Sequence, residues 1–307
     1  MFLKSFNKNK FNNLKLNAFL AIQLLIVSSN LVSAKEFNYY RSETVYLETQ
    51  EENAPSSNDR DLSKVGNSNI TNNLSDNALA KSESFFNQGI DKFNERNFNE
   101  AISFFSQAIE INPQYANAYL SRGIAYRKLQ NNLAAIEDYS KAIELEPSAS
   151  AYLNRGVARS RINDSNGALI DYSKAIDMQP DYIAAYLNRG NLKIQKKDFS
   201  GAIKDFNKVI ELEPGSHKAY FSRGRAHSSL EQNDKAIQDY TQAIYFNNKY
   251  AEAFYNRSVI KSRTRDYLGS MSDAEQAKGL YNLQHNQKGL EKSNKLIEYI
   301  KYKTSGN

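Results

Sequence analysis

The hexapeptide AYLNRG occurs at residues 151–156 and again, 34 residues later, at 185–190 of this 307-residue chain. Related hexapeptides recur at a step of 33 or 34 residues: SFFNQG at 84–89, AYLSRG at 118–123, AYFSRG at 219–224 and AFYNRS at 253–258. A second phrase, exemplified by AIEDYSKAIELEP at 135–147, repeats in step with the first. Repetition at a fixed period of this length is typical of chains built from stacked, similar units.

Each unit predicts a pair of helices. In the second phrase, apolar residues recur on one helical face, as Ala135, Ile136, Tyr139, Ala142 and Ile143 do. A proline then marks the end of this helix in four units: Pro113, Pro147, Pro180 and Pro214.

The first phrase carries a glycine, although glycine inside a helix costs about 1 kcal/mol relative to alanine. It recurs as Gly89, Gly123, Gly156, Gly190 and Gly224, which indicates a steric demand. The second phrase offers small residues at Ala101, Ala135, Ala168, Ala202 and Ala236, and rings at Phe105, Tyr139, Tyr172, Phe206 and Tyr240. We expect the small residues to let the two helices cross closely, while the rings fill the adjacent space.

These residues resemble the tetratricopeptide repeat over about residues 82–284, in the aromatic, Gly, Ala, second aromatic and Pro positions. The wording AYxNRG…AIxDYxKAI is similar to repeats of bacterial, especially cyanobacterial, proteins. The resemblance implies an all-α fold, an α-solenoid of helix–turn–helix repeats. The expected units are 82–115, 116–148, 149–182, 183–216, 217–250 and a degenerate 251–284.

The sixth unit departs from the pattern at three positions, where Ser258 replaces Gly, Ser270 replaces Ala and Ala274 replaces the second ring. Residues 285–307 follow it, with Leu290, Leu296, Ile297 and Ile300 on one helical stripe and many lysines opposite. We expect a C-terminal capping helix that covers the end of the array. An amphipathic helix on a membrane surface is the alternative.

The N-terminus resembles an export signal. Four lysines (Lys4, Lys8, Lys10, Lys15) precede the apolar run 18–27, and the small-residue sequence VSA follows at 32–34. We therefore expect a signal peptide over 1–34, cleaved after Ala34, and a periplasmic, thylakoid-lumenal or secreted protein. An uncleaved membrane anchor is the alternative. Because the chain has no cysteine, a lipoprotein anchor, disulfides and thiolate metal sites are excluded.

Residues 35–81 are rich in Ser, Asn and Asp without apolar periodicity, and they predict a flexible polar linker. The stretch YYRSETVYLE at 39–48 could instead form a short strand or a docking segment. Removing the four lysines of residues 1–34 lowers the net charge from +6 to +2 (6 − 4 = 2). A nearly balanced chain argues against nucleic acid as a partner.

Catalytic chemistry has no visible signature. His217, His227 and His285 are scattered, and no Gly-rich phosphate loop or HExxH motif is present. We therefore expect no enzyme activity, no cofactor, no metal site and no small-molecule substrate. The remaining functions are an exported adaptor that binds an unidentified protein or peptide, and a structural module that reaches a membrane only if the N-terminal segment is retained.

Units two to six share an Arg before the Gly or Ser position and an Asp before the second aromatic position. The pairs are Arg122 with Asp138, Arg155 with Asp171, Arg189 with Asp205, Arg223 with Asp239, and Arg257 with Asp273. In the first unit both are missing, and Gln88 and Phe104 stand there. This joint presence and absence predicts an ion pair between the two helices of each unit. The alternative is that the arginines bind a ligand.

The family resemblance also implies that the first helices line a concave groove for an extended or helical peptide. The groove positions that it marks are Phe86, Ile90, Leu120, Ile124, Arg127, Leu153, Val157, Arg161, Leu187, Asn191, Phe221, Arg225 and Tyr255. Phe or Leu stands at the earlier positions, where the family's carboxylate clamp has Lys and Asn, so chaperone C-terminal tails are not the expected ligand. The alternative is that these side chains pack against neighbouring first helices.

Overall fold

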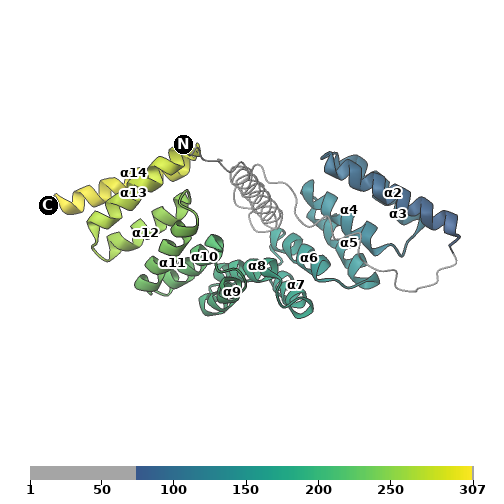
Figure 1. The fold of residues 1–307 in the computed structure, drawn as a ribbon, viewed down its shortest axis with the longest axis horizontal. Helices are drawn as coiled ribbons and strands as arrows, with labels where there is room; N and C mark the ends of the chain where they lie inside the picture. Colours follow the sequence, from purple (N-terminus) through teal and green to yellow (C-terminus); the bar gives the residue numbers. More distant parts are fainter. Residues whose placement is uncertain (1–73, 306–307) are drawn as a thin grey trace, which may run out of the picture. The chain divides into compact units, whose positions relative to one another are not determined.

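A computed structural model describes residues 74–305 of the chain. The predicted signal peptide and most of the predicted linker lie outside these residues. The described part contains thirteen α-helices and no strand (Figure 1). They are α2 (Asp76–Asn94), α3 (Phe98–Ile111), α4 (Ala116–Lys128), α5 (Asn132–Leu145), α6 (Ala149–Arg161), α7 (Ser165–Met178), α8 (Ile183–Gln195), α9 (Phe199–Leu212), α10 (His217–Ser229), α11 (Asn233–Phe246), α12 (Ala251–Arg263), α13 (Tyr267–Leu283) and α14 (Gln287–Thr304).

The helices pack in chain order, each against the helix before it and the helix after it. Even-numbered helices from α2 to α12 are the first helices of six helix pairs, and α3 to α13 are the second helices. The predicted all-α solenoid is therefore confirmed. One boundary differs from the prediction: α2 begins at Asp76 rather than near residue 82, because the side chain of Ser75 accepts a hydrogen bond from the backbone N–H of Ala78 and caps the helix.

Five of the six second helices begin at a side-chain cap, and α11 is the exception. Asn97, Asn131, Asp164, Asp198 and Asp266 each accept a hydrogen bond from the backbone N–H three residues later. Such caps satisfy amide donors that the first turn of a helix leaves unpaired. The prolines follow the C-caps of the second helices, as at Pro113 after Asn112, and so the polar turns fall where the sequence predicts them.

The recurring glycine lies beneath the recurring ring. A Cβ atom at Gly190 would lie 2.8 Å from Cε1 of Phe206, and one at Gly123 would lie 2.7 Å from Cε1 of Tyr139. Both distances are shorter than any normal carbon contact, so a larger residue would push the helices apart. Phe206 and Tyr139 are fully buried as a result, and the steric demand inferred from the repeated glycine has its cause in this contact.

Helix α14 covers the end of the array. Its Ile297 and Ile300 pack with Ala274, Tyr267 and Met271 of α13. These contacts confirm the expected capping helix, which shields apolar surface that the last helix pair would otherwise expose. Among the described residues, no helix is both long enough and apolar enough to span a membrane.

Candidate functional site

The structure brings each repeated Arg onto the Asp of its own repeat. In the fourth repeat, Arg189 of α8 donates from Nε and Nη2 to the two carboxylate oxygens of Asp205 in α9, at 3.0 and 2.7 Å. Asp205 is only 3% exposed. The other four pairs have the same two-pronged geometry, with donor–acceptor distances between 2.6 and 3.0 Å. Two parallel charge-assisted bonds fix the guanidinium plane relative to the carboxylate.

The remaining guanidinium nitrogen of each Arg, Nη1, donates a hydrogen bond to a side chain of the preceding repeat. Nη1 of Arg189 donates to the hydroxyl of Ser173 at 3.0 Å. The equivalent acceptors in the other repeats are Ser106 for Arg122, Ser140 for Arg155, Asn207 for Arg223 and Thr241 for Arg257. Each Arg therefore joins three helices from two repeats, and sequence analysis did not predict this contact.

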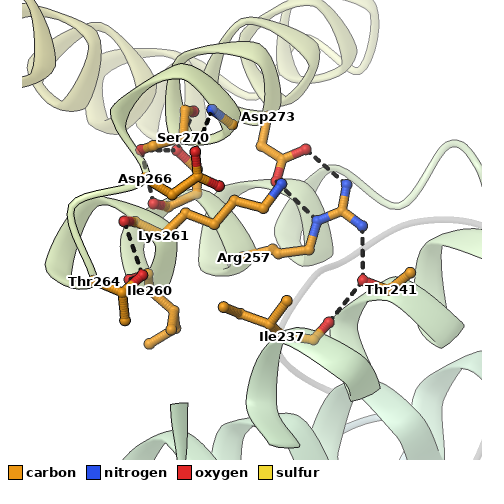
Figure 2. Close-up of polar contacts among 11 residues, drawn as sticks. Ile237, Thr241, Arg257, Ile260, Lys261, Thr264, Asp266, Ser270 and Asp273 are labelled. Atoms are coloured by element: carbon orange, nitrogen blue, oxygen red, sulfur yellow. Dashed lines mark hydrogen bonds and ion pairs between the residues drawn. The ribbon is translucent and has the colours of Figure 1, made fainter. Parts of the chain in front are cut away.

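Figure 2 shows this arrangement in the sixth repeat, where Arg257 lies between Asp273 of α13 and Thr241 of α11. The Thr241 hydroxyl in turn donates to the backbone carbonyl of Ile237 at 2.7 Å. Arg257 also lies over the ring of Phe254, with 5.7 Å between the guanidinium carbon and the ring centroid. The guanidinium is thus held on several sides and presents no free edge to a ligand, which favours the structural reading over ligand binding.

A second cation reaches three of the five aspartates. Arg159 contacts Asp171 at 2.8 Å, and Lys193 contacts Asp205 at 2.8 Å. Lys261 contacts Asp273 at 2.9 Å. These residues follow the first Arg by four positions, the spacing at which helical side chains share a face. The repeated i, i+4 cations were a visible signal that sequence analysis overlooked.

The second and fifth repeats differ at this position. In the fifth, His227 stands 3.8 Å from Asp239, too far for a hydrogen bond. In the second, Tyr126 stands there, and Asp138 has Arg122 as its partner. Burial raises the pKa of Asp138 above its ordinary value, because desolvation of the carboxylate outweighs the opposing effect of Arg122. Asp138 in turn raises the pKa of Arg122 through their hydrogen bonds.

The first repeat lacks both ionic partners, and aromatic contact takes their place. Phe104 of α3 stacks on Phe85 of α2, with ring centroids 6.4 Å apart and an interplanar angle of 27°. Gln88 instead donates to the backbone carbonyl of Ser84 on its own helix. In the first repeat, a contact between two rings thus joins the helices where the other repeats have the ion pair.

Seven of the thirteen predicted groove residues are buried: Phe86, Leu120, Arg127, Leu153, Val157, Leu187 and Phe221. Leu153 is 1% exposed and Leu187 is 3% exposed. A side chain with so little accessible surface offers little contact area to a peptide, and packing among the protein's own helices, the alternative named above, accounts for its burial. They pack inside the helix layer; Phe221, for example, packs with Tyr240 and Ile260.

The other six predicted groove residues keep accessible surface. Ile90, Ile124, Arg161, Asn191 and Tyr255 are half-buried, and Arg225 is exposed. Asn191 of α8 and Ser222 of α10 are linked directly, since the Ser222 hydroxyl donates to Oδ1 of Asn191 at 3.2 Å. The two residues belong to consecutive repeats, so their first helices present adjoining side chains on one face.

Successive first helices also contact one another directly. Direct contacts between helices two apart occur for α2 with α4, α4 with α6, α6 with α8 and α8 with α10, and for α12 with the capping helix α14. The first four of these contacts join first helices of consecutive repeats. The first helices therefore form a continuous face across consecutive repeats, from Ile90 in α2 to Arg225 in α10.

His217 and His227 lie in different surroundings. The ring of His217 meets Tyr250 edge-on at 5.5 Å, and His227 Nδ1 lies 2.7 Å from Oε1 of Gln232. Residues 74–305 contain no cluster of three His, Asp or Glu side chains that could hold a metal ion. The buried aspartates of the described residues are instead those of the five Arg–Asp pairs.

Known families match the repeats. Models described as tetratricopeptide repeat match residues 116–148 and residues 149–182, 183–216 and 217–250, and a TPR repeat model matches residues 95–130. Together they cover residues 95–250, a little over half of the chain.

The curated relatives match only part of the chain. The UDP-N-acetylglucosamine–peptide N-acetylglucosaminyltransferase of Giardia intestinalis is 44% identical over 66 residues, which are 21% of this chain and 4% of that protein. The chain thus spans a small fraction of that relative. Among solved structures, the MamA protein is 25% identical, with a TM-score of 0.52 over 56% of this chain and 94% of that chain.

A further solved structure shows the fold at lower identity. The C-terminal part of a TPR repeat-containing protein from Cytophaga hutchinsonii is 16% identical, with a TM-score of 0.62 over 72% of this chain and 89% of that chain. The repeat matches, the paired helices and the ring-over-glycine contacts agree with one another. The chain belongs to the tetratricopeptide-repeat family, and its fold is that of a protein-interaction scaffold.

Proposed function

We propose that the chain is a non-catalytic, exported scaffold that binds a segment of a partner protein along the face of its first helices. The observation that carries this proposal is the direct link between neighbouring first helices, made by Asn191 and Ser222. A face that continues from one repeat to the next can contact a single extended or helical segment at several points. The affinity of such a segment then grows with the number of repeats that it reaches.

The accessible residues of this face indicate the chemistry of the partner. Ile90 and Ile124 offer apolar contacts near its N-terminal end. Arg225 and Arg263 are both exposed, and both lie near the Tyr240 ring. Burial raises the pKa of Tyr240 above its ordinary value, and the positive charges of the two arginines oppose this rise. We infer a partner segment with apolar anchors and acidic residues. The buried Leu and Phe residues form the floor beneath this face and hold its shape.

A random-peptide display library, selected on the full chain, tests the proposal. We expect selected peptides to be rich in Asp and Glu, and we expect Arg225→Glu to weaken their binding about tenfold or more, because it reverses an exposed charge at the contact. Lys204→Glu is the matched control, since Lys204 is exposed on the second helix α9. Equal affinity of the Arg225→Glu and wild-type chains for these peptides would refute the proposed face.

Export is tested separately, by sequencing the N-terminus of the mature protein. A mature chain that starts at Lys35 supports the exported adaptor. An intact Met1 on protein in the membrane fraction supports the alternative, a structural module anchored by residues 1–34.

A further inference from the structure

Helix α14 has a second face, opposite the one that caps the array. Gly289, Ser293, Ile297 and Ile300 are buried against the rest of the array. On the opposite side, Lys288, Lys292, Lys295, Tyr299 and Tyr302 follow one another at spacings of four and three, and Lys303 comes directly after Tyr302. We call these six residues the Lys/Tyr stripe. Every one of them is exposed, and at 100° per residue they fall within one helical face.

The stripe contains no acidic residue, and its lysines are not neutralised by the described protein. None of the four lysines makes an ion pair with an acidic side chain of residues 74–305. The acidic residues of the same helix, Glu291 and Glu298, lie along one side of the stripe. Tyr299 is 47% exposed and Tyr302 is 56% exposed. The ammonium of Lys303 lies 5.7 Å from the ring centroid of Tyr299 and 5.8 Å from that of Tyr302. The positive charge and the rings therefore form one surface.

We propose that the Lys/Tyr stripe docks on the surface of a bilayer that contains anionic phospholipids. Lysines that lie within a Debye length of such a surface are attracted to its phosphates. Tyrosine is suited to the headgroup level, because its ring is apolar while its hydroxyl stays hydrated. Lys288 and Lys303 are 15 residues apart, so the stripe is about 22 Å long and straight, and a planar surface can meet all of it at once.

The same helix thus has two functions on two faces. The buried face closes the solenoid, and the stripe would orient the array on a membrane while the first helices remain available to a partner. This docking does not depend on the peptide-binding proposal, because no residue of the stripe belongs to the first helices. It also does not require a membrane-spanning segment, since the docked helix lies along the surface.

The absence of tryptophan from the chain makes a local test possible. Tyr302→Trp places a single fluorophore on the stripe, and Tyr245→Trp is the matched control, because Tyr245 is 77% exposed on α11. Each full-length variant is mixed with vesicles of phosphatidylcholine alone or with about one third phosphatidylglycerol. We expect a blue shift of the emission at position 302 with the anionic vesicles and none at position 245. No shift at 302, or equal shifts at both positions, would overturn the proposal.

Vesicle co-sedimentation measures the role of the charges. In the stripe variant, Lys288, Lys292, Lys295 and Lys303 become Gln; in the control variant, the exposed Lys174, Lys204, Lys235 and Lys249 become Gln. Both variants lose the same charge and keep residues 1–34. We expect the stripe variant to lose at least about tenfold in affinity for anionic vesicles, the control variant to bind like wild type, and salt to weaken wild-type binding.

Equal loss in the two variants would show a net-charge effect and refute the proposed surface. So would wild-type binding to soluble RNA or polyglutamate that exceeds binding to the vesicles, because the stripe would then serve another polyanion. Circular dichroism of both variants checks that α14 remains helical.

Discussion

The hydroxyl of Ser258 in α12 donates to the backbone carbonyl of Ser270 in α13 at 2.6 Å, and the hydroxyl of Ser270 donates to the carbonyl of Ser258 at 2.8 Å. In the five preceding repeats these positions hold Gly and Ala. Ala274 replaces the ring of those repeats. The sixth repeat thus joins its helices by two buried serines where the others use a ring over a glycine. The size of the ring and the size of the residue beneath it are coupled.

This coupling predicts the effect of enlarging a glycine. Gly190→Ala should lower the free energy of unfolding by about 1–3 kcal/mol, because the new methyl group would meet Phe206. Phe206→Ala alone should cost about 3–5 kcal/mol. The double variant should cost clearly less than the sum, since the methyl group then occupies space that the ring has left. Urea unfolding followed by circular dichroism measures all three values.

Gly279→Ala is the control for helix propensity. Gly279 lies in α13, and a Cβ atom there would have no neighbour within 4 Å. We expect no loss of stability and a gain of up to about 1 kcal/mol. Strictly additive costs for Gly190→Ala and Phe206→Ala would contradict the coupling.

The Arg–Asp contact predicts an asymmetric double-mutant cycle. Asp205→Ala should cost about 3–5 kcal/mol, because it leaves Arg189 and Lys193 partly buried without their carboxylate. Arg189→Met should cost less, because Lys193 still contacts Asp205. We expect a coupling energy of about 1–3 kcal/mol from the urea unfolding of the two single variants and the double variant.

The exposed pair Lys208 and Glu211, 2.6 Å apart on α9, gives the comparison. Its coupling energy should be much smaller than that of Arg189 and Asp205, because water screens both charges. A cycle at Arg189 and Asp205 that is no larger than this value would show that the buried contact does not couple the two helices.

Much of the fold could be predicted because the same residue types recur at the same positions of each repeat and make the same packing contacts. Six similar phrases in one chain act as internal comparisons, and the joint loss of Arg and Asp in the first repeat points to the pairing of Arg189 with Asp205. The contact from Arg189 to Ser173 could not be predicted in this way, because it joins two repeats and Ser, Asn and Thr all serve as acceptor.

The candidate binding face was less predictable. The family resemblance assigns Leu153 and Leu187 to the groove face of their first helices, but it does not tell whether that face meets solvent or a neighbouring helix. Both side chains are buried, whereas Arg225, at the next turn of its helix, is exposed. Burial depends on how closely successive first helices approach one another, and this distance is set by the stacking of repeats rather than by any one of them.

Tyr126→Lys should lower the pKa of Asp138. Burial raises this pKa, and the second repeat lacks the additional cation that Lys193 supplies to Asp205. A raised folded pKa means that Asp138 favours folding most at low pH, and this contribution is lost as the pH rises through the folded pKa. The new ammonium would favour the carboxylate, so the variant should gain stability relative to wild type as the pH increases.

Carbon NMR titration of the Asp138 carboxyl measures the shift directly. Tyr126→Met removes the phenol without adding charge, and it should leave the pKa of Asp138 raised. If the Asp138 carboxyl has the same pKa in Tyr126→Lys and in Tyr126→Met, the added ammonium does not reach Asp138. Position 126 would then not be the site of a second cationic partner in the second repeat.

The turn between the two helices of each repeat holds a residue in the left-handed region. Lys197 has φ of 61°, and Arg265 has φ of 67°, although neither is a glycine. The same conformation occurs at Arg96, Gln130, Asn163, Glu231 and His285. At Lys197 the turn is closed by two backbone bonds, from Lys197 N–H to the Ile194 carbonyl and from Asp198 N–H to the Lys193 carbonyl. This pattern is the Schellman motif, which favours Gly at the left-handed position.

Lys197→Gly should therefore raise the free energy of unfolding by about 1 kcal/mol, because a side chain in this conformation costs about that much. Asn163→Gly should gain less, since Asn tolerates a positive φ better than Lys does. Lys196→Gly is the control: its φ is −81°, so glycine there should bring no gain and cost some stability by loosening the unfolded chain. Thermal unfolding ranks the three variants, and an equal effect at positions 196 and 197 would show that the left-handed backbone at Lys197 stores no strain.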